Sequence, residues 1–189
     1  MVTTDTTKGL LEAVERIRPV IEEHAPNAEA NRSLPNPVYE AMFDAGQFAM
    51  LAPTAYGGLE MHPVEAMRVW EAVARIDSAA AWNLVMNQAT GGFAAWLPAE
   101  GAEELFGDGP TTVAGSFFPP GRATRVEGGW RITGQVAFTS GCDNARWLFM
   151  PAVEMDGDGQ QSSSLAPRPR SSTRGTRSAC EAPVRLISR

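Results

Sequence analysis

The segment 130–147, WRITGQVAFTSGCDNARW, predicts a strand whose apolar face ends in a hydroxyl group. Ile132, Val136 and Phe138 alternate with polar residues, which is the period-two pattern of a half-buried strand. The same count places Ser140 on the apolar face. A hydroxyl can donate and accept hydrogen bonds, so Ser140 is either a ligand-binding group or the first residue of a turn. The residues alone favour the turn, because Ser-Gly is common in turns.

Cysteine and histidine give little support for thiol or metal chemistry. Cys142 and Cys180 cannot build a disulfide framework, and His24 and His62 lie too far apart for a typical metal-ligand spacing. A lone cysteine in a turn is usually just buried. We therefore expect no metal site and no reactive thiol.

The charge is distributed unevenly along the chain. Residues 1–160 contain 10 basic and 21 acidic side chains, a net charge of −11, whereas residues 161–189 contain six arginines and one acid, a net charge of +5. The acidic part argues against a nucleic-acid partner, since phosphate binding needs a basic face. The sequence contains no run of 18 apolar residues and no signal-peptide pattern. We expect no membrane association and a cytoplasmic location.

Helical periodicity dominates the first part of the chain, and strand patterns follow it. The predicted helices cover about 5–23, 36–46, 64–76, 78–96 and 98–107. The predicted strands cover about 111–118, 122–127, 130–139 and 145–153. The last strand is nearly continuous in apolar residues, which predicts burial on both faces.

The predicted fold class is α+β. An all-helical N-terminal domain (1–106) is followed by a partial antiparallel β-barrel or sheet domain (107–155). Residues 156–189 are rich in Ser, Arg and Pro without apolar periodicity, so we expect a linker and a disordered basic tail. Its abrupt composition also suits a segment translated out of frame.

Three motifs in this order resemble the acyl-CoA dehydrogenase superfamily of flavoproteins over about residues 8–155. Residues 53–58, PTAYGG, are similar to the family's Pro-x-x-Tyr-Gly-Gly loop, and residues 74–84, ARIDSAAAWNL, to the segment that leads into the cavity helix. The third motif is GGWRITGQVAFTSGCDNARW, residues 128–147. The resemblance implies a helical domain followed by strands and then a four-helix bundle.

The resemblance also implies a flavin, either FAD or FMN, including diffusible reduced flavin. Phe138 would form an apolar wall beside the flavin ring, and Ser140, the catalytic candidate, would place its hydroxyl near N5. Ser116 would contact the pyrimidine edge of the ring. Trp82 and Asn87 would line the substrate cavity, although aromatic residues at helical spacing are more often part of a core.

Two chemistries occur within the superfamily, and the motifs favour one of them. FTSGCDNARW is similar to the Phe-x-Ser-Gly-x-x-x-Ala-x-Trp pattern of the flavin-dependent monooxygenases, and the dehydrogenases' Thr-Glu-Pro-x-Ala-Gly-Ser-Asp stretch is absent. The resemblance implies a two-component monooxygenase that uses reduced flavin from a separate reductase and O2 on a small organic substrate. Ser140 would then slow the loss of peroxide, and the full-length form would be a homotetramer.

Two departures from the family leave alternatives open. Asn87 stands where several monooxygenases carry a histidine, and an amide cannot act as a base at neutral pH. Nothing after residue 160 resembles the C-terminal bundle, so we expect a truncated chain. The alternatives are an FAD-dependent acyl-CoA dehydrogenase and a non-catalytic remnant that associates through its exposed apolar strand.

Overall fold

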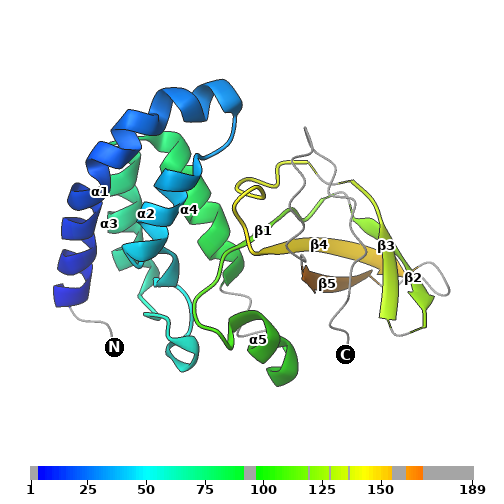
Figure 1. The fold of residues 1–189 in the computed structure, drawn as a ribbon. Helices are drawn as coiled ribbons and strands as arrows, with labels where there is room; N and C mark the ends of the chain where they lie inside the picture. Colours follow the sequence, from blue (N-terminus) through cyan, green and yellow to red (C-terminus); the bar gives the residue numbers. More distant parts are fainter. Residues whose placement is uncertain are drawn as a thin grey trace.

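A helical part and a small sheet follow each other along the chain (Figure 1). The computed structural model describes residues 4–91, 97–118, 120–127, 129–135, 137–154 and 161–167. The helices are α1 (Thr4–Asn31), α2 (Asn36–Asp44), η1 (Gln47–Ala49), η2 (Thr54–Tyr56), α3 (Pro63–Ala74), α4 (Ser78–Gly91) and α5 (Ala99–Phe106). The strands are β1 (Val113–Gly115), β2 (Gly121–Val126), β3 (Gly129–Thr133), β4 (Trp147–Glu154) and β5 (Gln161–Pro167). The predicted order of a helical region followed by a sheet is confirmed.

The main core lies between α1, α2, α3 and α4. The apolar stripe of α1 is buried as its spacing predicts, with Val14 and Ile21 almost fully covered. The helix continues past the predicted end at Glu23 and places Ala28, which is also buried, in its last turns. This extension brings the C-terminal end of α1 to the site described below.

Side-chain caps set the starts of α3 and α4. His62 precedes α3, and its Nδ1 accepts a hydrogen bond from the Val64 amide at 3.3 Å. Asp77 precedes α4, and its Oδ1 accepts a hydrogen bond from the Ala80 amide at 2.6 Å. A carboxylate at this position satisfies a free amide and interacts favourably with the helix dipole. Asp77 thereby fixes where α4 begins.

The 53–58 loop links the helical core to a second core. Gly57 has a left-handed φ of 72°, and a Cβ at Gly58 would overlap the Ala52 carbonyl. Both positions therefore need glycine. Tyr56 packs on Phe106, with ring centroids 5.9 Å apart. Phe106 belongs to the second core, which also contains Leu105, Val113, Trp147 and Phe149.

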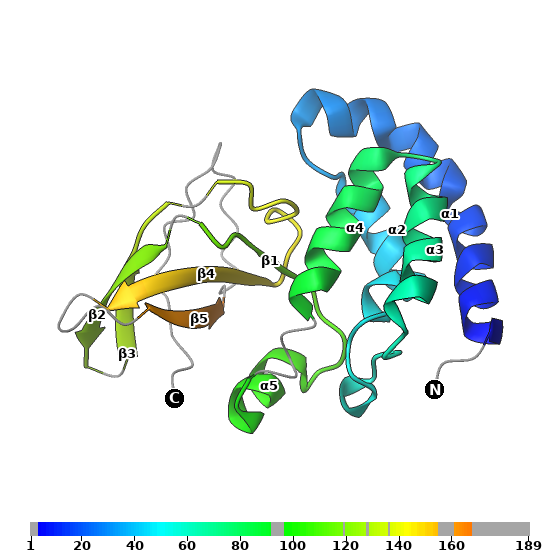
Figure 2. The ribbon, with the colours of Figure 1, turned by 180° about the vertical axis from the view of Figure 1, so that it is seen from behind.

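The sheet is mixed, so the prediction of an antiparallel sheet is wrong. β4 pairs parallel with β1 and with β2, and antiparallel with β5. The antiparallel pair β2–β3 is joined by a short turn, whereas β1 and β2 connect to β4 through longer chain segments that allow parallel pairing. Figure 2 shows α4 at the side of the helical part that faces the sheet, with β1 beside it.

The predicted strand over 130–139 is wrong in its second half. β3 ends at Thr133, because its partner β2 pairs with it only from Arg122 onward. Phe138 has a left-handed φ of 59°, which a strand does not allow. The alternation that continued through Ser140 in the sequence therefore does not describe one face of one strand.

Two further predictions about strands are corrected. β4 buries Trp147, Phe149 and Ala152, whereas the residues between them are only half-buried, so it is not buried on both faces. Residues 161–167, predicted as disordered, form β5 along one edge of β4. Backbone pairing to an available edge needs no apolar pattern, which explains why this Ser-rich segment gave no signal. The rest of the predicted tail lies outside the described residues.

Candidate functional site

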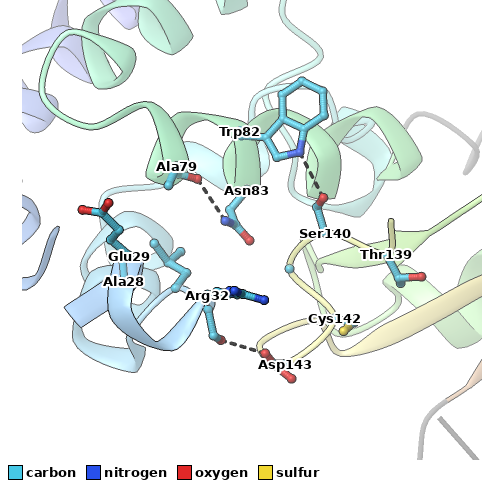
Figure 3. Close-up of a pocket in the computed structure, with 13 residues that line it drawn as sticks. Ala28, Glu29, Arg32, Ala79, Trp82, Asn83, Thr139, Ser140, Cys142 and Asp143 are labelled. Carbon is cyan, nitrogen blue, oxygen red and sulfur yellow. Dashed lines mark hydrogen bonds between the residues drawn. The ribbon is translucent and has the colours of Figure 1, made fainter. Parts of the chain in front are cut away.

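A cavity of about 390 Å³ lies where the helical part meets the sheet (Figure 3). Three segments form it: the C-terminal end of α1 with the residues that follow, the start of α4, and the turn that precedes β4. Its lining residues are Ala28, Glu29, Arg32, Ser33, Leu34, Ala79, Trp82, Asn83, Thr139, Ser140, Gly141, Cys142 and Asp143. Segments more than one hundred residues apart in the sequence therefore share one site.

Trp82 and Ser140 meet at this cavity. The indole Nε1 of Trp82 donates a hydrogen bond to Ser140 Oγ at 3.0 Å. Figure 3 shows the indole on α4 pointing at the serine on the turn. Trp82 is 55% exposed, so it is not a core residue. The structure thus joins two predicted site residues that lie 58 positions apart.

Hydrogen bonds hold the turn that follows Ser140 against the α1–α2 connection. Ser33 Oγ donates to Asp143 Oδ2 at 2.7 Å, and Asn144 Nδ2 donates to Asn36 Oδ1 at 2.8 Å. Each bond joins the helical part to the turn before β4. These bonds hold the turn that carries Ser140 against the start of α2, while Trp82 contacts Ser140 from α4.

Gly141 allows the turn to approach α4 closely. Its φ is 78°, and a Cβ there would overlap Asn87 Nδ2 and lie 2.8 Å from Asn83 Oδ1. Only glycine combines this left-handed backbone with this lack of volume. Because the turn lies so close to α4, Trp82 can reach Ser140 and form its hydrogen bond.

The cavity lining carries charges of both signs. Arg32 has a left-handed φ of 52°, and its guanidinium forms no ion pair with any residue that the structure describes. Glu29 and Asp143 add negative charges, and Asp143 is engaged by Ser33. Sequence reasoning missed Arg32, Ser33 and Asp143 as lining residues. Only the Gly-Cys-Asp-Asn turn beside Ser140 gave a local signal for any of them.

The other predicted site residues lie outside the cavity lining. Asn87 is buried and donates to the Asn83 carbonyl at 3.0 Å, within its own helix. Ser116 Oγ donates to the Phe118 carbonyl at 3.1 Å, in a local turn. Phe138 is 94% exposed. The roles predicted for these three residues stay predictions.

Two of these observations fit a flat ligand with a polar edge, as flavin is. The Ser140 hydroxyl receives one hydrogen bond and keeps its own proton for another partner. The exposed ring of Phe138 lies two positions away in the chain and is free to stack on an aromatic surface. The Ser116 hydroxyl, by contrast, is already engaged.

A helical part followed by a small mixed sheet is the arrangement that this chain shares with acyl-CoA dehydrogenase-like proteins. The family described as acyl-CoA dehydrogenase, N-terminal domain, matches residues 4–105. The chain belongs to this family, which confirms the resemblance found in the sequence.

The chain is similar to oxygenases of known function. It is 28% identical over 144 residues to the oxygenase subunit HsaA of a flavin-dependent monooxygenase from Mycobacterium tuberculosis, covering 76% of this chain and 36% of that protein. It is 32% identical over 147 residues to indole-3-acetate monooxygenase from Pseudomonas putida, covering 77% of this chain and 38% of that protein. The chain thus spans less than half the length of these relatives.

Solved structures agree with this similarity. XiaF from Streptomyces sp., solved in complex with FADH2 and glycerol, matches with a TM-score of 0.80 and 26% identity over 86% of this chain and 42% of that chain. The HsaA monooxygenase from M. tuberculosis matches with a TM-score of 0.77 and 28% identity over 86% of this chain and 45% of that chain.

Proposed function

We propose that this chain supplies the Ser140 side of the flavin site in the oxygenase component of a two-component monooxygenase. The proposed substrate is a small aromatic compound, and the reduced flavin comes from a separate flavin reductase. The similarity to a flavin-dependent oxygenase subunit and to an indole-3-acetate monooxygenase supports this proposal. A relative named p-hydroxyphenylacetate 3-hydroxylase, oxygenase component, from Acinetobacter baumannii also supports it.

The observation that carries the proposal is the Ser140 hydroxyl at the junction cavity. It is held by Trp82 and keeps hydrogen-bonding capacity for a ligand. Reduced flavin, when bound, supplies the two electrons needed to insert one oxygen atom of O2 into a substrate and convert the other to water. Ser140 orients the polar edge of the ring, and the exposed Phe138 side chain packs on its face.

The residues near Ser140 contribute orientation rather than proton transfer. Asn87 is an amide, so it does not act as a base near neutral pH, and it packs beneath Gly141 of the site turn. Arg32 brings one positive charge to the cavity and is the lining residue able to pair with an anionic group, whereas Glu29 and Asp143 bring two negative charges.

Replacing Ser140 with alanine tests the proposal. The wild-type chain is expected to bind reduced FMN or reduced FAD under anaerobic conditions, measured by quenching of tryptophan fluorescence. Ser140→Ala is expected to weaken this binding by about three- to tenfold, which corresponds to the loss of one hydrogen bond.

Ser78→Ala is the matched comparison, since the Ser78 side chain is exposed and does not line the cavity, and it is expected to leave the affinity unchanged. A folded wild-type chain that binds neither reduced flavin would contradict the proposed function. Equal affinity of wild type and Ser140→Ala for reduced flavin would show that the Ser140 hydroxyl does not contribute to binding.

A further inference from the structure

We infer that Trp82 is a positioning residue that orients the Ser140 hydroxyl toward the bound flavin. This inference rests on the proposed function and assigns to Trp82 a task other than lining the substrate cavity. Its basis is the 3.0 Å hydrogen bond between Trp82 Nε1 and Ser140 Oγ.

The direction of this hydrogen bond is fixed by chemistry. An indole N–H can only donate, whereas a serine hydroxyl has two lone pairs and one proton. Ser140 Oγ is therefore the acceptor. The bond between Tyr39 and Thr112 differs, because there either hydroxyl can be the donor.

Accepting the indole hydrogen bond leaves Ser140 with one lone pair and its proton. Within the described part of the chain, Ser140 Oγ has no second hydrogen-bond partner. N5 of oxidised flavin accepts a hydrogen bond, and N5–H of reduced flavin donates one. A hydroxyl held in this way serves both redox states, and the indole bond also polarises it for donation.

The surroundings prevent Ser140 from turning away from Trp82. Gly141 packs against Asn83 and Asn87 of the same helix that carries Trp82. Asp143, three positions after Ser140, is tied to Ser33. The turn thus holds Ser140 near Trp82, and the indole selects the rotamer of the hydroxyl.

Trp82→Phe tests the inference, because it removes the N–H and keeps an aromatic ring. Trp82 is 55% exposed, so the variant is expected to fold. The affinities for oxidised and reduced FMN are expected to fall about three- to tenfold. In a Ser140→Ala background the same change is expected to have no further effect, because the hydroxyl is already gone.

Trp70→Phe is the matched control. The Trp70 indole also donates a hydrogen bond, to Gln88 Oε1 at 3.0 Å, but Trp70 does not line the cavity. This variant is expected to lower stability and leave FMN affinity unchanged. Ser140→Thr, which keeps a hydroxyl, is expected to retain the dependence on Trp82.

The outcomes separate this inference from the proposed function. A folded wild-type chain without flavin affinity would overturn both. Flavin binding that Trp82→Phe leaves unchanged, or weakens equally with and without the Ser140 hydroxyl, would overturn the inference alone. A non-additive loss, seen only when the hydroxyl is present, would establish it.

Discussion

At the residue scale, the structure separates residues that shape the chain from those that line the junction cavity. The Pro-Thr-Ala-Tyr-Gly-Gly motif belongs to the first group. Thr54 Oγ1 donates to Glu60 Oε2 at 2.8 Å, and the Thr54 amide donates to the same oxygen at 3.2 Å. These bonds close the loop that carries Tyr56. They also lower the pKa of the Glu60 carboxyl, with the Thr54 hydroxyl as the largest cause.

The Glu60 carboxyl gives a prediction about pH. Its pKa is lower in the folded chain than in the unfolded chain, so its contribution to stability is present above the unfolded pKa and is lost as the pH falls through the folded pKa. Thr54→Val removes the hydroxyl donor and brings the pKa closer to its ordinary value. The variant is expected to lose less stability on acidification, measured by urea unfolding from about pH 7 to about pH 3.

Thr54→Ser, which keeps the hydroxyl, is the control and is expected to follow the wild type across this pH range. Identical acid dependence in wild type and Thr54→Val would show that the hydroxyl does not set the Glu60 pKa. Glu60→Gln removes the titrating group and gives the baseline for both variants.

At the element scale, the candidate site lies in the turn before β4 and not in the strand that the sequence predicted over 130–139. Local patterns predicted α1, since Val14 and Ile21 recur at helical spacing and are buried. They failed over 130–139, because strand length depends on the partner and a left-handed Phe138 leaves no trace in an alternating pattern. β5 was missed because its pairing comes from the edge of β4.

The candidate site was predictable only in part. Ser140 stood out because a hydroxyl followed apolar residues, and Trp82 entered through the resemblance to the family. Their hydrogen bond joins α4 to a turn 58 positions later, a contact that no local pattern encodes. Ser33 and Asp143 were missed for the same reason, since their bond spans 110 positions.

Gly141 gives a prediction for the contact between the turn and α4. Gly141→Ala forces a side chain into a left-handed backbone and into Asn87. We expect a loss of about 1–3 kcal/mol in the free energy of unfolding, together with weaker flavin binding, because the turn must move away from Trp82. Urea unfolding and flavin titration measure the two effects.

Gly46→Ala is the matched control for backbone strain. Gly46 has a similar φ of 73°, but a Cβ there would have no neighbour within 4 Å. We expect this change to cost about 1 kcal/mol and to leave flavin affinity unaltered. If the two variants lost the same stability and both bound flavin with wild-type affinity, the close packing of Gly141 on α4 would not contribute to flavin binding.

At the scale of the whole molecule, several contacts join the helical part to the sheet. They include the site turn, the packing of β1 against α4, the second core that α5 shares with β1 and β4, and the hydrogen bond between Thr112 Oγ1 and the Tyr39 hydroxyl at 2.9 Å. We propose a division between a helical unit ending at about residue 106 and a β unit beginning at about residue 107. None of the described helices is long and apolar enough to cross a membrane. The homotetramer and the cytoplasmic location stay predictions.

We expect the junction cavity to place Ser140 against a flavin ring, and a crystal structure of the chain with FMN is the most direct test. In that structure we expect the ring edge beside Ser140, with N5 within about 3.5 Å of Oγ and the Trp82 indole still bonded to the same oxygen. A ring bound elsewhere on the chain, or one beside the turn with Ser140 pointing away from it, would show that Ser140 does not bind the flavin.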